Sequence, residues 1–235
     1  LKEDRSNMSP RGFDNVPERG SSSFIPTIRL RDNGESCRLR FLTDYDDFFW
    51  ERFHRRMKGR EFQGFFVCEN SAFNKPCAAC SAGDKSIVLI HAWVYESVHD
   101  YTEPQEDTKA IKEGRRTVYR KTVNEPKLFR ISVAHKGSIV LSIEKVGTLL
   151  EHDFDWVRSG KRGDVNTSYT LDFGEKLSEE DKEEMVKIAA SLPSLEDAVL
   201  GKVTSLDTET STTGYRKNYS VVSVSVDEDD EEVPF

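Results

Sequence analysis

Three cysteines lie close together in the first half of the chain and limit what this segment can form. Cys68, Cys77 and Cys80 fall within thirteen positions, and the last two make a Cys-x-x-Cys pair. Such a pair places two thiols on one tight turn, and zinc in proteins takes four tetrahedral ligands from thiolates and imidazoles. The sequence therefore predicts a bound zinc ion in preference to disulfides, which are typical of secreted proteins.

The predicted zinc site needs a fourth ligand, and the sequence offers three candidates. His54 precedes the cysteines, His91 follows them, and Cys37 lies well upstream. Of these we favour His54. We expect Cys37 to be a small buried hydrophobe, because Leu39 and Phe41 share its face of a strand. Three thiolates and one imidazole would close the coordination shell, so the zinc would be structural and would leave no position for a substrate.

No catalytic motif accompanies the cysteines. Pro76, Cys77 and Cys80 match the P-C-x-x-C half of the zinc deaminase signature, but the H-x-E half is missing because Arg55 and Arg56 follow the histidine. The sequence also contains no G-x-S-x-G, no phosphate-cradling glycine-rich loop and no H-E-x-x-H. We therefore expect a binding protein and no enzyme.

Length and apolar content suggest a soluble chain. The 235 residues fit one domain with appendages. No run approaches the roughly 18 apolar residues of a membrane helix, and the first residues lack the apolar region of a signal peptide. We therefore expect an intracellular protein.

Charge is distributed unevenly along the chain. Residues 1–175 hold 28 Lys+Arg against 27 Asp+Glu, whereas residues 176–235 hold 6 against 15, so the formal net charge of -8 divides into +1 and -9. Bases cluster between Arg52 and Arg60 and between Arg115 and Lys121. These clusters predict a positive surface despite the acidic total.

Periodicity predicts mainly short strands with a few helices. Residues 139–150 show the spacing of one helix face, Ser178 and Ser194 are candidate N-caps, and residues 100–114 read as a polar loop. The expected strands cover residues 37–41, 61–67, 86–95, 117–122, 128–133, 154–158 and 166–173, and the expected later helices cover residues 179–190 and 195–200.

This pattern predicts a mostly β fold with accessory helices, an OB-fold-like barrel with an inserted zinc-binding knuckle. The expected organisation runs along the chain in five parts. It comprises a mobile N-terminal arm (1–23), an OB-like core (24–201) with a zinc subdomain at about 52–84, a Ser/Thr-rich linker (202–226) and an acidic partner-binding tail (227–235).

A family resemblance follows from the four candidate ligands. In order and approximate spacing, His54, Cys68, Cys77 and Cys80 resemble the zinc ligands of the helix-destabilising, single-stranded DNA-binding proteins of T-even bacteriophages. The stretch 154–169 also looks like a strand pair of related phage proteins. The resemblance implies an OB-like core, self-association through the N-terminal arm, and an acidic C-terminus that contacts replication proteins. It further implies a protein that coats and protects unpaired DNA during replication, recombination and repair in the cytoplasm of a bacterial host.

The C-terminal end carries a second resemblance. Its last residues are similar to the acidic tip of bacterial single-strand-binding proteins, which implies recruitment of partners such as a polymerase, a helicase or a helicase loader. A terminal aromatic with its free carboxylate suits an apolar pocket rimmed by bases, and the adjacent acids would steer the encounter. The predicted partner-binding residues are Asp229, Asp230, Glu231, Glu232, Val233, Pro234 and Phe235.

We expect DNA binding by charge and stacking, in which bases neutralise phosphates and aromatic rings hold the nucleobases. For each aromatic, a place in the core is an equal alternative. A zinc-stapled adaptor or regulator that prefers duplex DNA is the competing function. The predicted DNA contacts are Arg38, Arg40, Arg52, Arg55, Arg56, Lys58, Arg60, Trp93, Tyr95, Arg115, Arg116, Tyr119, Arg120, Lys121, Trp156, Arg158 and Tyr169.

Overall fold

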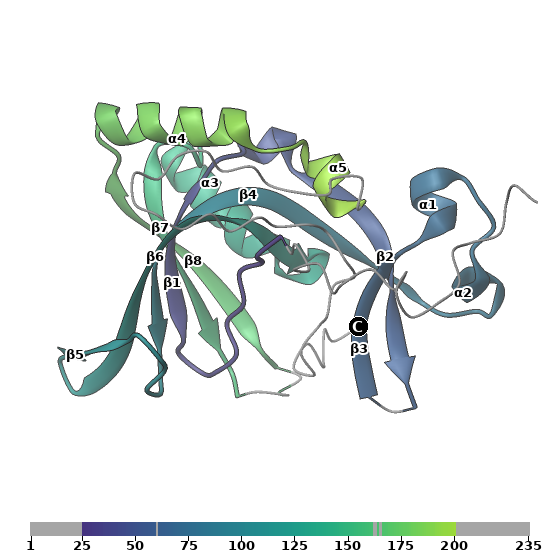
Figure 1. Ribbon diagram of the computed structural model, residues 1–235, viewed down its shortest axis with the longest axis horizontal. Coiled ribbons are helices and arrows are strands. Elements are labelled where there is room, and N and C mark those ends of the chain that lie inside the picture. The colour runs from purple at the N-terminus through teal and green to yellow at the C-terminus, as the bar shows by residue number, and fades with distance from the viewer. Residues whose placement is uncertain (1–24, 60, 162–163, 165, 201–235) are drawn as a thin grey trace, which may run out of the picture.

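The structure, a computed structural model, describes residues 25–59, 61–161, 164 and 166–200 (Figure 1). The expected N-terminal arm, the Ser/Thr-rich linker, the acidic tail and Arg60 lie outside the described residues. None of the helices in the described ranges combines the length and the apolar character that crossing a bilayer requires.

The described chain is mostly β and forms one antiparallel sheet. The strand order is β3-β2-β4-β1-β7-β8, with β6 paired to β4 and β5 paired to β6. All the expected strands are present, while β2 and β5 were not expected, and two predicted pieces form the single long strand β6. The strands are β1 (Ser36–Phe41), β2 (Phe49–Lys58), β3 (Glu61–Val67), β4 (Ser86–Tyr101), β5 (Lys109–Glu113), β6 (Arg116–Ser132), β7 (His152–Ser159) and β8 (Ser168–Lys176).

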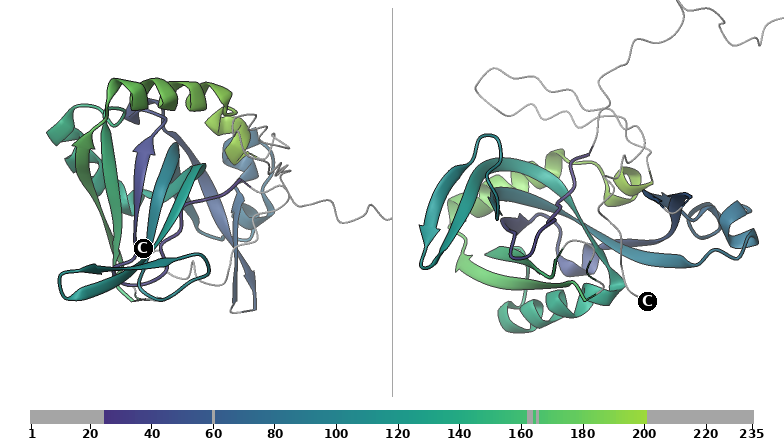
Figure 2. Two further views of the ribbon diagram at one scale, coloured as in Figure 1. Left: turned by 60° about the vertical axis from the view of Figure 1, so that its left-hand side comes forward. Right: turned by 90° about the horizontal axis from the view of Figure 1, so that it is seen from below.

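The sheet is open, so the expected OB-fold-like barrel is not confirmed. Among the described residues, β3 and β8 end the strand order and do not pair with each other. The reason lies in β4, because β2 and β1 occupy successive stretches of its same edge, residues 86–91 and 94–100. Beyond that shared edge the two partner strands diverge, and β2 with β3 forms a separate ribbon (Figures 1 and 2).

Helices cover the sheet and its ends. The expected N-caps are confirmed, since the Ser178 and Ser194 side chains accept hydrogen bonds from the backbone N–H of Asp181 and Asp197. In Figure 1, α4 crosses the top of the sheet, whereas α1 and α2 lie beside the β2–β3 ribbon, at the end opposite its hairpin turn. The α-helices are α1 (Glu69–Phe73), α2 (Ala78–Ser81), α3 (Lys136–Val146), α4 (Glu179–Ser191) and α5 (Leu195–Val199), and single 3-10 turns are η2 (Tyr45–Asp47) and η3 (Val133–His135).

The larger apolar core lies where β1 meets β4, β6 and β7. Cys37, Leu39 and Phe41 are buried on one face of β1, as the alternation predicted. Phe41 meets Phe129 and Phe154 edge-on, with ring centroids 5.5 Å apart in both pairs. Burial of each such ring contributes about 1.5–3 kcal/mol, so this aromatic cluster is a major source of stability.

The opposite face of β4 is also covered. A second cluster joins Trp93 and Leu128 to Leu195 and Ala198 of α5, and the Trp93 indole N–H donates to the Pro193 carbonyl at 3.0 Å. Trp93 is 4% exposed. The prediction that it stacks on DNA bases is therefore wrong for this conformation, because the short helix α5, anchored by its Ser194 cap, occupies the space that a base would need.

A network of charged side chains is buried inside the fold. The imidazole of His99 lies between two carboxylates, with Nε2 2.8 Å from Glu35 Oε1 and Nδ1 2.7 Å from Glu96 Oε1. Lys127 pairs with Glu96 from the other side, and the backbone N–H of Asp32 donates to Glu35 at 2.9 Å. The network ties the segment before β1 to β4 and β6, and nothing in the sequence pattern indicated it.

Candidate metal centre and nucleic-acid surface

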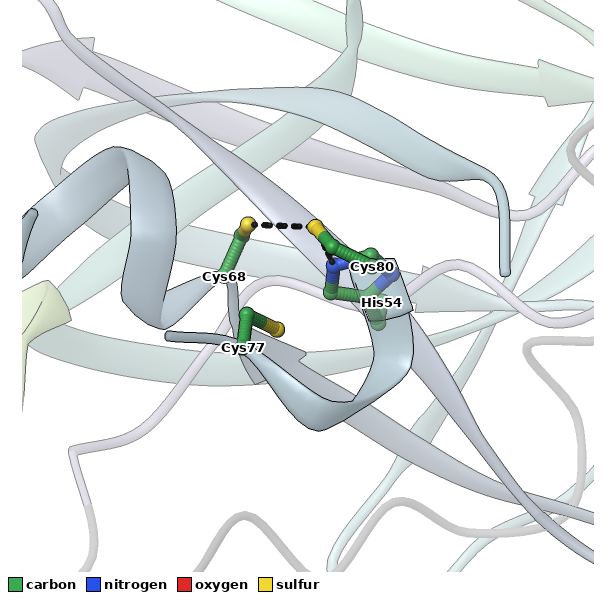
Figure 3. Close-up of side chains that lie close together, drawn as sticks. All are labelled: His54, Cys68, Cys77 and Cys80. Atoms are coloured by element: carbon green, nitrogen blue, oxygen red, sulfur yellow. Dashed lines mark hydrogen bonds between the residues drawn. The ribbon is translucent and has the colours of Figure 1, made fainter. Parts of the chain in front are cut away.

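The four predicted metal ligands come together at the base of the β2–β3 ribbon, where β2 leaves β4 (Figure 3). Their ligand atoms all lie within 4.8 Å of one another. His54 Nε2 is 3.3 Å from Cys80 Sγ, and the sulfurs of Cys68 and Cys80 are 3.5 Å apart. A tetrahedral ion with metal–sulfur bonds of about 2.3 Å would separate its sulfurs by roughly 3.7 Å. The cluster therefore has the size and the donor set of a metal site.

Local structure explains how the cysteines converge. The backbone N–H of Cys68 donates to the Arg52 carbonyl at 2.8 Å, which extends the β2–β3 pairing up to the first cysteine. Cys68 and Cys77 are the N-cap residues of α1 and α2, and the left-handed residue Asn74 ends α1. Two short helices, each beginning at a cysteine, thus fold back over β2.

The thiols influence one another's ionisation. Backbone N–H groups, that of Cys80 first, donate to the Cys77 sulfur and lower the pKa of that thiol. Hydrogen bonds to the sulfurs of Cys68 and Cys77, together with burial, raise the pKa of Cys80 to about 11. Three adjacent thiolates repel one another, so full ionisation of this cluster requires a cation at its centre.

The alternative fourth ligands lie elsewhere. Burial, with repulsion from Arg130 as the second cause, lowers the pKa of His91 to about 3, and its ring packs against Phe53. Burial in the main core raises the pKa of Cys37 well above its ordinary value. His54 is thus the ligand that the fold brings to the three cysteines, as the sequence predicted. Its Nδ1 is buried without a hydrogen-bond partner among the described residues.

Three of the predicted DNA-binding bases line β2 beside the metal cluster. Arg52, Arg56 and Lys58 are exposed, and strand alternation places them on the same face as His54. Arg56 lies over the Phe66 ring at 5.7 Å. Among the side chains that the structure describes, no carboxylate forms an ion pair with these three bases; the side chain of Glu61, whose backbone lies opposite Lys58, is outside that description. Arg55 is half-buried on the opposite face.

The predicted basic face of β1 is neutralised by acids. The antiparallel register with β7 places Asp155 opposite Arg38 and Asp153 opposite Arg40. The resulting ion pairs measure 2.9 and 2.7 Å, and Asp181 of α4 also pairs with Arg40 at 2.7 Å. These two arginines therefore pair with acids of the neighbouring strand within the sheet. Only the strand register shows this role.

Arg120 is neutralised in the same way. It pairs with Asp100 at 2.7 Å and with Glu113 at 3.0 Å, and Asp100 faces it across the β4–β6 register. The predicted phosphate contacts of all three paired arginines would require these bonds to break.

Arg158 and Trp156 are buried, which corrects their predicted role in DNA contact. The Arg158 guanidinium donates to Tyr169 Oη at 2.7 Å, to Thr167 Oγ1 at 3.1 Å and to the carbonyls of Leu30, Gly160 and Lys161. The half-buried Tyr169 ring stacks on Trp156 with centroids 5.1 Å apart. The alternating run at residues 154–158 is strand β7, and its alternate side chains face the core. Its Arg158 holds the β7–β8 loop in place by hydrogen bonds.

The remaining predicted contacts lie far from the β2 bases. Arg115 and Arg116 are exposed at the turn of the β5–β6 hairpin, Arg116 donates to the Gly34 carbonyl, and Tyr95, Tyr119 and Lys121 are half-buried. Figures 1 and 2 place this hairpin and the β2–β3 ribbon at opposite ends of the molecule. The predicted bases therefore do not form one continuous surface.

One exposed aromatic was not predicted as a DNA contact. Trp50 on β2 is 61% exposed and shares its face of the strand with Arg52. The signal was available in the alternation Trp50-x-Arg52, but β2 was not expected to be a strand.

Comparison with protein-family models finds no match for this chain, and comparison with curated proteins finds none either. Fold and site geometry therefore have to support any assignment of function.

Proposed function

We propose that this protein binds single-stranded DNA without catalysing a reaction, and that zinc at His54, Cys68, Cys77 and Cys80 holds the binding ribbon in shape. The observation that supports this most is the row of exposed bases on the strand that also carries His54: Arg52, Arg56 and Lys58, none of which pairs with a carboxylate among the described side chains. Side chains on one face of a strand repeat about every 6.6 Å, so Arg56 and Lys58 are one such step apart and Arg52 is two steps from Arg56, a spacing that suits a chain of phosphates.

The chemistry of binding is electrostatic. Bases that neutralise phosphates release condensed counterions, so affinity falls steeply with salt. Among the described side chains, Arg52 and Arg56 form no ion pair with a carboxylate, so phosphate contact there breaks no ion pair that the structure shows. Zinc would supply coordination bonds only, because three thiolates and one imidazole fill a tetrahedral shell.

The finer assignments belong to the same proposal. We propose that the open sheet is a relative of the OB-fold barrel, with α3 at one side of the core, and that the protein acts in a phage-infected bacterial cytoplasm. The acidic C-terminal residues would recruit replication and recombination proteins, and the N-terminal arm would support self-association on DNA.

The test compares a 20-nucleotide single strand with the matched duplex across a salt series. We expect tighter binding to the single strand, and each of Arg52→Gln and Arg56→Gln should lower the slope of log K against log salt by about 1. Arg38→Gln is the matched control and should leave the slope unchanged, because its guanidinium is paired with Asp155. Absence of binding in dilute buffer would refute the proposal, and a preference for the duplex would favour the zinc-stapled regulator.

A further inference from the structure

Trp50 differs from the other two tryptophans in its exposure. Trp50 is 61% exposed, whereas Trp93 and Trp156 are 4% and 3% exposed. The buried pair belong to the two larger apolar clusters, so their positions are explained by packing. An indole left in water forgoes the stabilisation of burial, and tryptophan is enriched at interfaces, where one part of the ring is covered and the other meets water.

The neighbours of Trp50 define the chemistry of its surface. Across the β2–β4 register, Ile90 lies opposite Trp50 and Val88 lies opposite Arg52, and both aliphatic residues are half-buried. Glu51 lies between Trp50 and Arg52 in sequence and therefore on the other face of β2. There its carboxylate accepts a hydrogen bond from Ser71 Oγ. The surface is therefore apolar at Trp50 and positively charged about 6.6 Å further along the strand.

A ligand that complements this surface needs a planar apolar face joined to an anion. An unpaired nucleotide has both, because its base offers an open π-face and its phosphate carries a negative charge. In a duplex each base face is already covered by the next base pair, so duplex DNA can satisfy the arginine and leave the indole uncovered. The complementarity thus selects unpaired over paired nucleic acid.

We propose that Trp50 is the base-stacking platform of the β2 surface, with Arg52 holding the phosphate of the stacked nucleotide, and that this pair distinguishes single strands from duplexes. The inference rests on the proposed function and assigns its strand selectivity to one residue. Arg52 acts on either form of DNA, whereas Trp50 acts on unpaired bases alone.

Tryptophan fluorescence tests the proposal directly, because Trp50 is the one tryptophan of the chain that a base can reach. In the full-length wild-type chain, a saturating single strand should quench the long-wavelength part of the emission, and the duplex should not. In Trp50→Ala this quenching should disappear while the emission of the buried pair remains. Affinity for the single strand should fall about 5- to 150-fold, with duplex affinity unchanged.

Two further variants separate loss of the aromatic ring from a general effect of substitution. Trp50→Phe retains a ring and should recover much of the single-strand affinity without the quenching. Phe173→Ala removes another exposed aromatic, 47% exposed on β8, and should change neither. Thermal unfolding of all variants should match the wild type within about 2–4 °C, since a surface substitution costs little.

The possible failures are distinguishable. If Trp50→Ala binds the single strand as tightly as the wild type, or keeps its quenching, the platform assignment is wrong and the proposed function stands. If the wild-type chain binds no oligonucleotide at all, the proposed function is wrong and the platform assignment is lost with it.

Discussion

Removal of the His99 imidazole should strongly destabilise the fold. In His99→Leu, the carboxylates of Glu35 and Glu96 lose partners at 2.8 and 2.7 Å while both remain buried. Breaking a buried ion pair from one side costs about 3–5 kcal/mol. Glu96 keeps Lys127 and Glu35 keeps the backbone N–H of Asp32, so we expect about 3 kcal/mol. At roughly 2–4 °C per kcal/mol for a chain of this size, the midpoint should fall by about 6–12 °C.

Thermal and urea denaturation at neutral pH measure this loss. His135→Leu is the matched control, because that half-buried ring packs edge-on against Tyr169 and should cost less than about 1 kcal/mol. In the His99→Leu background, Glu35→Gln should recover part of the loss, since a buried amide costs less than a buried charge. A loss in His99→Leu no larger than that of the control would refute the ionic reading of the network.

The pH dependence of the same difference has a definite sign. Burial favours the neutral imidazole, but hydrogen bonds to Glu35 and Glu96 outweigh it and raise the pKa of His99 above 6.5. Burial likewise opposes ionisation of the two carboxyls, yet the hydrogen bond to His99 lowers the pKa of both below 4.5. The contribution of His99 to folding stability is fully present below pH 6.5, the unfolded-state pKa, and is lost as the pH rises through its raised folded-state pKa. The contributions of Glu35 and Glu96 to folding stability are fully present above pH 4.5 and are lost as the pH falls through their lowered folded-state pKa values.

The stability difference between wild type and His99→Leu should therefore be largest between pH 4.5 and 6.5. A difference that keeps growing in alkaline buffer would contradict this assignment of charges.

Two further predictions concern the metal and the buried arginine. The purified chain should hold about one zinc ion, and removal of the ion by a strong chelator should make the segment with α1 and α2 sensitive to proteolysis. Metal analysis should show that Cys77→Ser loses the metal and that Cys37→Ala keeps it. Arg158→Leu should cost about 3 kcal/mol in urea denaturation because several buried acceptors lose their donor, whereas Arg38→Leu, whose pair is exposed, should cost less than about 1 kcal/mol. Retention of metal by Cys77→Ser, or equal losses in the two arginine variants, would contradict the respective assignment.

The sequence predicted those elements whose apolar residues follow a single period. β1 alternates cleanly between buried and exposed residues, and α4 and α5 begin at serine caps that fix their first turns. β2 escaped prediction because its buried positions include Glu51 and His54, which read as polar. Glu51 is buried where it accepts a hydrogen bond from Ser71, and His54 is buried beside the cysteine cluster. The burial of both residues therefore depends on the segment with α1 and α2, which folds over β2.

The metal ligands were predictable because their chemistry requires a particular set of residue types at short spacing. The DNA contacts were less so, because an arginine has the same local signature whether it faces a phosphate or a carboxylate. Arg38 and Asp155 are 117 positions apart, and only the antiparallel register of β1 and β7 makes them partners. Burial of Trp93 likewise depends on α5, about a hundred residues later in the chain.

The distribution of paired bases links the metal to the proposed binding surface. Arg38, Arg40 and Arg120 stabilise strands that already pack on the main core, whereas Arg52 lies near the end of the β2–β4 pairing and Arg56 lies on the β2–β3 ribbon beyond it. The segment that carries α1 and α2 at the base of that ribbon has a small apolar cluster of its own, made of Cys68, Cys77, Ala79 and Phe66. So few buried groups contribute only a few kcal/mol, while a structural zinc ion in small domains contributes on the order of 10 kcal/mol. A metal ion bound there would stabilise the base of the ribbon without using Arg52 or Arg56.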